Sequence, residues 1–193
     1  MSVADPHRVV LTGENPFLRL SEKDGDPNST DASYWRILFC PAGPGHVLYL
    51  KSELTHGHWR IYSDNIAMAR WLQQTVQGML NPELKDLSIP VIDADFSKSG
   101  DPRYFWTEYV SAADAEIALT WHDIGDPLLI HTEPNQEPNP RPYGVCTVLV
   151  PALSGRLTLN GQQARGKPWP REREGRPFST SALAFSESWT ETR

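Results

Sequence analysis

The sequence predicts a mainly β protein, an antiparallel barrel or a double-sheet roll with one mid-chain helix at about residues 65–80. About a dozen short segments alternate apolar and polar residues with the period of a strand. Seventeen prolines are spread along the chain, which favours short elements joined by turns. Only one segment has apolar residues at helical spacing, so a doubly wound α/β fold with alternating strands and helices is disfavoured.

Five strand candidates precede the predicted helix, and turn residues separate them. In the clearest, Trp35 and Ile37 share one face and Arg36 lies on the other, as the period of two along a strand requires. The segment from Pro41 to Gly45 then forms a turn before the return strand. The five candidates cover residues 9–12, 17–20, 34–40, 46–52 and 55–62.

The candidate strand at 55–62 carries two histidines on one face. His56, His58, Arg60 and Tyr62 alternate with residues such as Trp59, which can cover the helix on the opposite face. We therefore expect the histidine face to look into the protein and not into solvent.

The predicted helix has Ser63 or Asp64 as its N-cap, and Asn81 followed by Pro82 ends it. Its apolar stripe should pack across the sheet or close one end of a barrel. The stripe consists of Ile66, Ala69, Leu72, Val76 and Met79.

Seven further strand candidates follow the helix. The segment 143–150 is apolar on both faces, which is typical of a strand covered on both sides. In the last strand, alternation places Leu183, Phe185, Glu187 and Trp189 on one face. The seven candidates cover residues 88–96, 103–110, 116–123, 127–133, 143–150, 156–160 and 181–189.

A chain of 193 residues is long enough for one domain with a full core, so we predict a single β-barrel-like domain over residues 1–193. Two known architectures resemble the predicted strand pattern. A lipocalin-like closed barrel and a cupin-like double-sheet roll both fit, and the position of the helix between strands slightly favours the barrel.

The composition excludes several classes of partner. The net charge is −6 and no basic run follows a predicted face, so nucleic acid is not an expected partner. No apolar run approaches the roughly 18 residues of a membrane span, and the N-terminus lacks the apolar stretch of a signal peptide. Two cysteines far apart in sequence are typical of free thiols in a reducing compartment, so we predict a cytoplasmic protein, and a homodimer stays open.

One candidate site is a metal site made of two pairs of residues. His56 and His58 form the first pair and His131 and Glu133 the second, each spaced by two along a strand. Three imidazoles and a carboxylate suit a single divalent iron, manganese, zinc, nickel or copper ion. The pattern is similar to the cupin arrangement, but no Glu follows His58 at cupin spacing, and the chain is not assigned to that family. The alternative is that no metal binds.

A second candidate site rests on carboxylates among aromatic residues. Glu187 lies between Phe185 and Trp189, and Glu108 lies beside Trp106 at alternate positions. A carboxyl group on an inward apolar face has a raised pKa unless a cation pairs with it, and Arg36 or Arg60 is the predicted partner of Glu187. The predicted ligand-binding residues are Arg36, Arg60, Tyr62, Trp106, Glu108 and Trp189.

These residues predict a protein that holds a small organic ligand inside the barrel. The favoured function is an enzyme that uses His56, His58, His131 and Glu187 for acid–base chemistry, as a lyase, isomerase, cyclase or hydrolase. Such an enzyme needs no cofactor. The alternatives are a metal-dependent cupin-like enzyme and a non-catalytic carrier or sensor. No serine or cysteine nucleophile motif is present.

Overall fold

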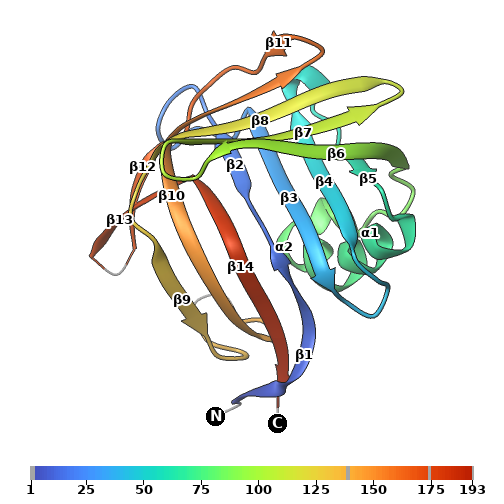
Figure 1. Cartoon of the computed structure of the whole chain (residues 1–193), viewed down its shortest axis with the longest axis vertical. Coiled ribbons are helices and arrows are strands. Elements are labelled where there is room, and N and C mark those ends of the chain that lie inside the picture. Colours follow the sequence, from blue (N-terminus) through green and yellow to red (C-terminus); the bar gives the residue numbers. More distant parts are fainter. Residues whose placement is uncertain (1–2, 138–139, 174, 193) are drawn as a thin grey trace.

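The computed structural model describes residues 3–137, 140–173 and 175–192, and it is mainly β (Figure 1). The predicted fold class is confirmed. The strands are β1 (Ala4–Glu14), β2 (Phe17–Leu20), β3 (Thr30–Phe39), β4 (Gly45–Ser52), β5 (Arg60–Ser63), β6 (Val91–Asp101), β7 (Phe105–Ala112), β8 (Ala115–Ile124), β9 (Leu128–Thr132), β10 (Gly144–Leu159), β11 (Gln162–Gln163), β12 (Pro170–Arg173), β13 (Arg176–Ser179) and β14 (Ser181–Thr192). The helical elements are η1 (Glu53–Thr55), α1 (Ile66–Leu72), η2 (Gln73–Gln77), α2 (Gly78–Leu80) and η3 (Pro82–Lys85).

One 12-stranded sheet closes into a ring of hydrogen-bonded strands. The ring runs β14-β2-β3-β4-β5-β6-β7-β8-β10 and returns to β14. Closure depends on β10, which spans 16 residues where we expected two separate strands. Its first half pairs with β14 and β9, and its second half pairs with β8 and β11. Closure into a ring leaves β10 no free edge.

All strand pairings in the ring are antiparallel except β5–β6. The segment that joins these two strands contains α1, η2, α2 and η3. Parallel neighbours need such a crossover, because a tight turn can only reverse the chain. The helical region from α1 to η3 is therefore what allows β6 to run parallel to β5.

Apolar side chains fill the interior of the ring. Tyr34, Leu48 and Tyr62 point inward from β3, β4 and β5, and Trp121 and Leu183 meet them from β8 and β14. All five are essentially inaccessible to solvent. The interior is therefore a packed core, whereas we expected a ligand there.

A second core lies between the helical region and the outer face of the ring. Trp35 and Tyr49 point outward from β3 and β4 and pack against Ala69, Leu72 and Val76. The prediction that the helix packs its apolar stripe on the sheet is thus right for these three positions. Ile66 is 55% exposed instead, because it begins the helix next to the N-cap.

The helix begins at Asn65 and is irregular in its middle. The Asn65 side chain, and not Ser63 or Asp64, caps α1 by accepting a hydrogen bond of 3.1 Å from the N–H of Met68. The turn η2 is a π-helix, which inserts one extra residue into the helical spacing. As a result Gln73 and Gln77 are buried beside the apolar stripe, although their polar side chains suggested a solvent-facing position.

The prediction that His56 and His58 lie on a strand and face the interior is wrong. The side chain of Ser52 accepts a hydrogen bond from the N–H of Leu54, and the Thr55 hydroxyl accepts one from the N–H of Ser52. This capping box starts the short helix η1 and ends β4. Both histidines are exposed in the turn that follows, and strand β5 begins only at Arg60.

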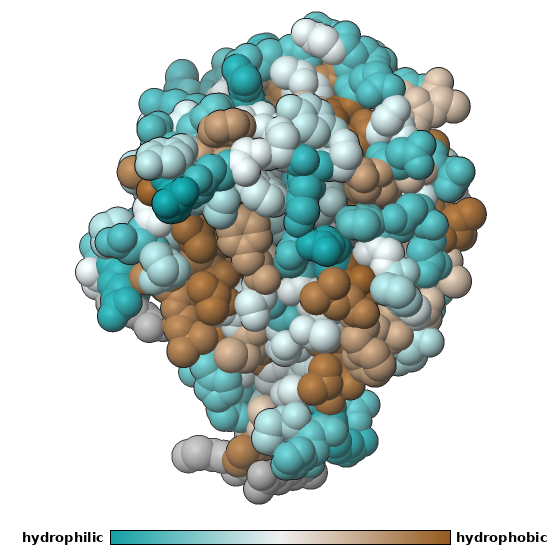
Figure 2. Space-filling view, in the orientation of Figure 1, coloured by the Kyte–Doolittle hydropathy of each residue, from teal (hydrophilic) through white to brown (hydrophobic). Residues whose placement is uncertain are grey.

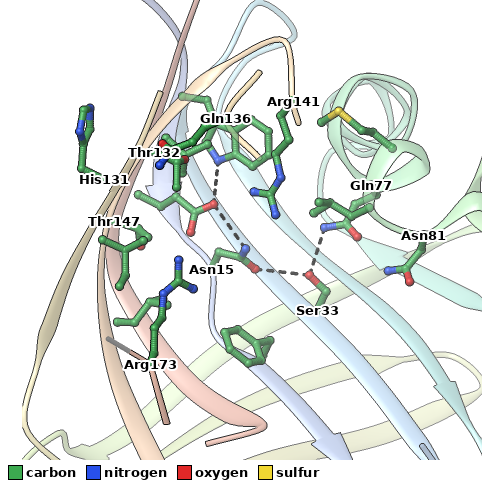
Figure 3. A pocket seen from close by; sticks show the side chains of 18 of the residues that line it. Asn15, Ser33, Gln77, Asn81, His131, Thr132, Gln136, Arg141, Thr147 and Arg173 are labelled. Carbon is green, nitrogen blue, oxygen red and sulfur yellow. Dashed lines mark hydrogen bonds between the residues drawn. The ribbon is translucent and has the colours of Figure 1, made fainter. Parts of the chain in front are cut away.

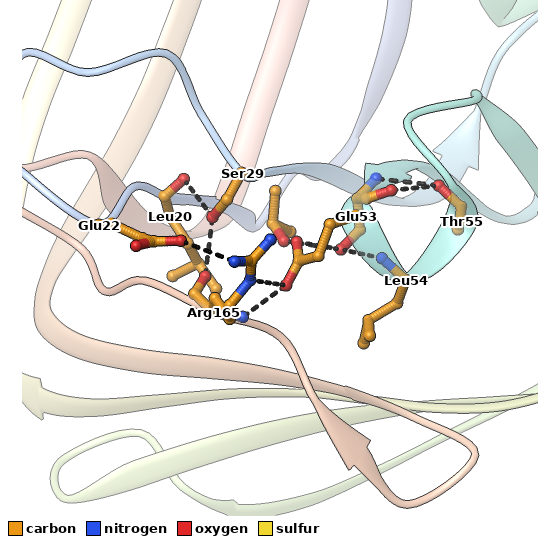
Figure 4. A network of polar contacts seen from close by, with 9 residues as sticks. Leu20, Glu22, Ser29, Glu53, Leu54, Thr55 and Arg165 are labelled. Atoms are coloured by element: carbon orange, nitrogen blue, oxygen red, sulfur yellow. Dashed lines mark hydrogen bonds and ion pairs between the residues drawn. The ribbon is translucent and has the colours of Figure 1, made fainter.

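A neighbouring loop fixes the η1 turn in place (Figure 4). The backbone N–H of Arg165 donates a hydrogen bond of 2.6 Å to Glu53 Oε1, and Ser29 donates one of 2.7 Å to the carbonyl oxygen of Arg165. These contacts hold the histidine turn against a loop at the surface. Among the described residues, no helix is long and apolar enough to cross a membrane.

Candidate functional site

A cleft of about 780 Å³ opens on the outer face of the ring. Its floor is formed by β14 and the first half of β10, with η2 and α2 on one side and β9 with the loop before β10 on the other. Figure 2 shows one face of the molecule in the orientation of Figure 1, with brown apolar areas on either side of a paler, more polar band. The volume lies within the roughly 300–1,000 Å³ of small-molecule sites. The cleft is therefore the candidate site, and it lies outside the barrel.

A β-bulge in β14 turns Glu187 toward this cleft. Val148 pairs with Ser186 and Leu149 pairs with Ala184, so Phe185 is the extra residue. Leu183 and Phe185 belong to the interior core, whereas Trp189 belongs to the outer core under the helix. The expectation that Leu183, Phe185, Glu187 and Trp189 share one face is thus wrong, because the bulge reverses the alternation after Phe185.

Glu187 is held by hydrogen bonds from two sides. The indole Nε1 of Trp189 donates to Glu187 Oε1 at 2.7 Å, and Asn15 Nδ2 donates to the same oxygen at 3.5 Å. The chain of polar groups continues along the cleft (Figure 3). Ser33 donates to Asn15 Oδ1 at 3.3 Å, and Gln77 Nε2 donates to Ser33 Oγ at 3.1 Å. A single polar network therefore connects β14, the link between β1 and β2, β3 and the π-helical turn.

The carboxyl group of Glu187 is only 5% exposed. Burial raises its pKa above the ordinary 4.5, while Trp189, Asn15 and Thr147, through hydrogen bonding, and the charge of Arg141 act in the opposite direction. Neither predicted cation is its partner. Arg36 pairs with Glu14 at 3.0 Å and Arg60 pairs with Asp114 at 3.0 Å, and neither arginine lines the cleft. Glu187 is a buried carboxyl group suited to giving or taking a proton.

Two buried polar atoms in the cleft have no hydrogen-bond partner within the described part of the chain. They are Gln77 Oε1 and Thr147 Oγ1. Thr147 lies opposite Glu187 in the β10–β14 pairing. Buried polar atoms in proteins are nearly always satisfied, so an orphaned pair beside a cleft is the pattern expected where a ligand or water completes the bonding.

Arginine side chains supply positive charge at the cleft. The Arg141 guanidinium lies 5.5 Å from the centre of the Trp189 indole ring, within the range of a cation–π contact. Arg173 lines the cleft from the end of β12. Arg141 comes from the segment between β9 and β10, and it is not among the site residues that the sequence predicts.

Of the predicted acid–base histidines, only His131 lies at the cleft. Its side chain is 53% exposed and its Nε2 lies 3.6 Å from Glu133 Oε1. Figure 3 shows its ring pointing away from Asn15. The other carboxyl oxygen of Glu133 accepts a hydrogen bond of 2.7 Å from the backbone N–H of Ala4. This pair therefore sits at the rim of the site and not at its centre.

The predicted metal ligands are not assembled. His56 and His58 lie in the exposed turn after η1, and neither lines the cleft that His131 borders. Among the residues that the structure describes, no group of three or more His, Cys, Asp or Glu side chains could hold a metal ion. The strand on which the pairing of His56 with His131 depended is absent, so metal binding stays a prediction without this set of ligands.

The other predicted ligand-binding residues lie mainly in the barrel interior. Trp106 Nε1 donates to Glu108 Oε1 at 2.7 Å, and burial raises the pKa of Glu108. Tyr62 is fully buried, and Arg60 donates to its hydroxyl at 3.4 Å. Arg36 pairs with Glu14 at 3.0 Å. Trp189 is the one member of this predicted set that lines the cleft.

Comparison with known proteins gives no guide to this site: no family model, no curated protein and no solved structure matches the chain.

Proposed function

We propose that this protein binds a small organic molecule in the outer cleft and acts on it through acid–base chemistry at Glu187. The observation that carries the proposal is the buried Glu187 carboxyl group at the floor of the cleft. Within the described residues, both of its hydrogen bonds go to Oε1 and none to Oε2. Oε2 is thus not occupied by Trp189 or Asn15, and the neighbouring side chain that acts on the carboxyl group from β10 is Thr147.

The surroundings of Glu187 suit proton transfer. Burial favours the neutral carboxyl form, which can donate a proton to an oxygen of the substrate. The resulting carboxylate is stabilised by Trp189, Asn15 and the charge of Arg141, so it can take a proton back in a later step. Lyase, isomerase, cyclase and hydrolase reactions all use such a step. His131 is not required, because it stands exposed at the rim.

The proposal is tested with Glu187→Gln, which keeps the shape of the side chain and removes its titrating proton. Purified protein is incubated with a mixture of small metabolites, and the compounds lost and formed are followed by mass spectrometry. We expect the unchanged protein to convert at least one compound and Glu187→Gln to convert none.

Glu108→Gln is the matched control, because Glu108 is also buried and also accepts a hydrogen bond from a tryptophan two residues away. It should leave conversion intact. If compounds bind the unchanged protein and none is converted, the acid–base proposal is wrong and the carrier or sensor alternative holds. If Glu187→Gln converts compounds at the rate of the unchanged protein, Glu187 has no role in the chemistry.

A further inference from the structure

Two arginines reach into the cleft from different walls. Arg141 precedes β10 and Arg173 ends β12, and Figure 3 shows both guanidinium groups pointing into the space between the walls. Among the described residues, neither Arg141 nor Arg173 forms an ion pair, whereas Arg19 in the same lining pairs with Asp31 at 3.6 Å. The cleft therefore holds two cationic groups that the described chain does not neutralise by direct contact.

The two guanidinium charges also act on each other. Burial is the largest cause that lowers the pKa of Arg141, Glu187 acts in the opposite direction, and the charge of Arg173 lowers this pKa again. Bringing like charges together in a partly desolvated cleft is unfavourable, and an anion between them relieves the repulsion. The planar guanidinium group also matches carboxylate and phosphate oxygens with two parallel hydrogen bonds.

We propose that the molecule bound in the cleft is an organic anion whose carboxylate or phosphate group is held between Arg141 and Arg173. This inference rests on the proposed function, because it names the class of ligand that the same cleft takes. It places the anionic group on the Arg141 side of Glu187 and leaves Glu187 Oε2 to meet a neutral part of the ligand.

The remaining groups of the cleft define the rest of the ligand. Gln77 Oε1 is a buried acceptor without a partner in the described residues, so it calls for an N–H or O–H group. Trp189 presents an aromatic face between Arg141 and the outer core. A compact organic acid with a flat apolar body and a hydroxyl or amino group fits these contacts.

Binding is measured with four probes: benzoate, phenyl phosphate, inorganic phosphate and benzamide, the last being a neutral counterpart of benzoate. The readout is the NMR chemical shift of the Trp189 indole N–H, assigned with Trp189→Phe. We expect benzoate or phenyl phosphate to bind at least about tenfold more tightly than benzamide, a difference of about 1.4 kcal/mol. Benzoate against phenyl phosphate distinguishes a carboxylate site from a phosphate site, and inorganic phosphate shows whether the anion alone suffices.

Arg141→Ala and Arg173→Ala should each weaken binding of the preferred anion at least about tenfold. Arg171→Ala is the control, because Arg171 lies on the same strand, pairs with Asp24 at 2.8 Å and does not line the cleft. It should leave affinity unchanged. Arg141→Lys keeps the positive charge but cannot donate two parallel hydrogen bonds to the anion. It provides a second measurement of the role of Arg141 if Arg141→Ala does not fold.

The outcomes separate the two proposals. Equal affinities for benzoate and benzamide, with no effect of either arginine change, would overturn the anion inference while leaving a small-molecule cleft in place. Anion binding that Arg171→Ala weakens as much as Arg173→Ala does would also overturn it, because general surface charge then explains the affinity. If none of the probes shifts the Trp189 signal and the metabolite mixture yields no bound or converted compound, the proposed function fails as well.

Discussion

Trp189 donates its indole N–H to the carboxylate of Glu187, two residues earlier on the same strand, at 2.7 Å. Trp106 and Glu108 repeat the relationship on β7, also at 2.7 Å. Because side chains two apart on a strand point to the same side, a tryptophan can reach across and satisfy a carboxyl oxygen that burial removes from water. The same tryptophan-to-glutamate hydrogen bond thus occurs in the outer cleft and in the barrel interior.

The two pairs differ in what surrounds them. Glu108 lies in the packed interior, where Lys98 lies 5.2 Å from the Trp106 ring centre and near Glu14. Glu187 lies at the floor of an open cleft with Arg141 close to the Trp189 ring. Glu187 therefore lines a cleft, whereas Glu108 is enclosed by the interior core. A substitution in one pair can thus serve as the control for the same substitution in the other pair.

Trp189→Phe should raise the pKa of Glu187 further. The change keeps the aromatic wall and removes the 2.7 Å hydrogen bond, which leaves Glu187 Oε1 with the weaker 3.5 Å bond from Asn15. Loss of a donor to the charged form favours the neutral form. The check is an NMR titration of the carboxyl carbon of Glu187, and Trp106→Phe should leave that titration unchanged. An unaltered pKa in Trp189→Phe would mean that the Trp189 hydrogen bond does not contribute to it.

Leu72→Ala should destabilise the protein by about 2–5 kcal/mol, because truncation of a buried leucine loses apolar burial and leaves a cavity. Leu72 is fully buried between the helix and the outer face of the ring. Ile66→Ala is the control, since Ile66 is 55% exposed, and it should cost less than about 0.5 kcal/mol. Chemical denaturation measures both. Equal losses for the two variants would contradict the outer packing of α1.

The general fold follows from local patterns that the sequence displays. Alternation in β3 separates Trp35 from Tyr34, and the structure places them in the outer and inner cores. Glu187 was identified from its position beside Trp189, and it is buried. These features depend on neighbours close in sequence, so periodicity and residue type suffice to find them.

The errors arise where one residue changes the period. The bulge at Phe185 reverses the face of Glu187, and the π-helical turn brings Gln77 under the helix. Neither insertion has a sequence signature as clear as a proline or glycine. The Ser52–Thr55 capping box is different, because Ser at the cap and Thr three residues later indicate a helix start. In the sequence this signal competes with the strand-like alternation of His56 and His58.

Arg141 and Arg173 could not have been found from local patterns. Arg141 lies between β9 and β10, and Arg173 ends β12, which belongs to a separate two-stranded sheet. Both line the same cleft only because of how these distant segments are arranged in the folded chain. Residues brought together in this way have no regular spacing in the sequence. The sequence therefore indicated that Glu187 is buried, and it gave no signal for the two arginines.

His56→Ala together with His58→Ala should leave both stability and the Trp189 NMR signal of the bound protein unchanged. Both imidazoles are exposed in the turn after η1 and neither lines the cleft. His56 is the C-cap of η1, but the cap hydrogen bond comes from its backbone N–H, which alanine keeps. Exposed substitutions that leave caps and cores intact usually change stability by no more than about 0.5 kcal/mol. Thermal unfolding and the probe titration check this. A loss of probe binding in this double variant would show that His56 or His58 contributes to the binding site.

The stability of the protein should depend on pH through its two buried carboxyl groups. Burial raises the pKa of Glu187 and of Glu108 above 4.5 in the folded state. The folded protein then binds more protons than the unfolded chain between 4.5 and each raised value, so the free energy of unfolding decreases as pH rises through that window. The slope is at most about 1.4 kcal/mol per pH unit for each group. Below the window both groups are protonated in both states, and their stabilising contribution is complete.

Glu187→Gln and Glu108→Gln should each remove one group's share of this slope, and the double variant should remove both. Urea denaturation at a series of pH values measures the free energy of unfolding directly. Glu133→Gln is the control, because Glu133 lies at the rim and its side chain is 40% exposed. If the free energy of unfolding decreases above pH 4.5 as steeply in the double variant as in the unchanged protein, other groups cause the decrease. Folding would then not raise the pKa of Glu187, and the argument that burial favours its neutral form would be wrong.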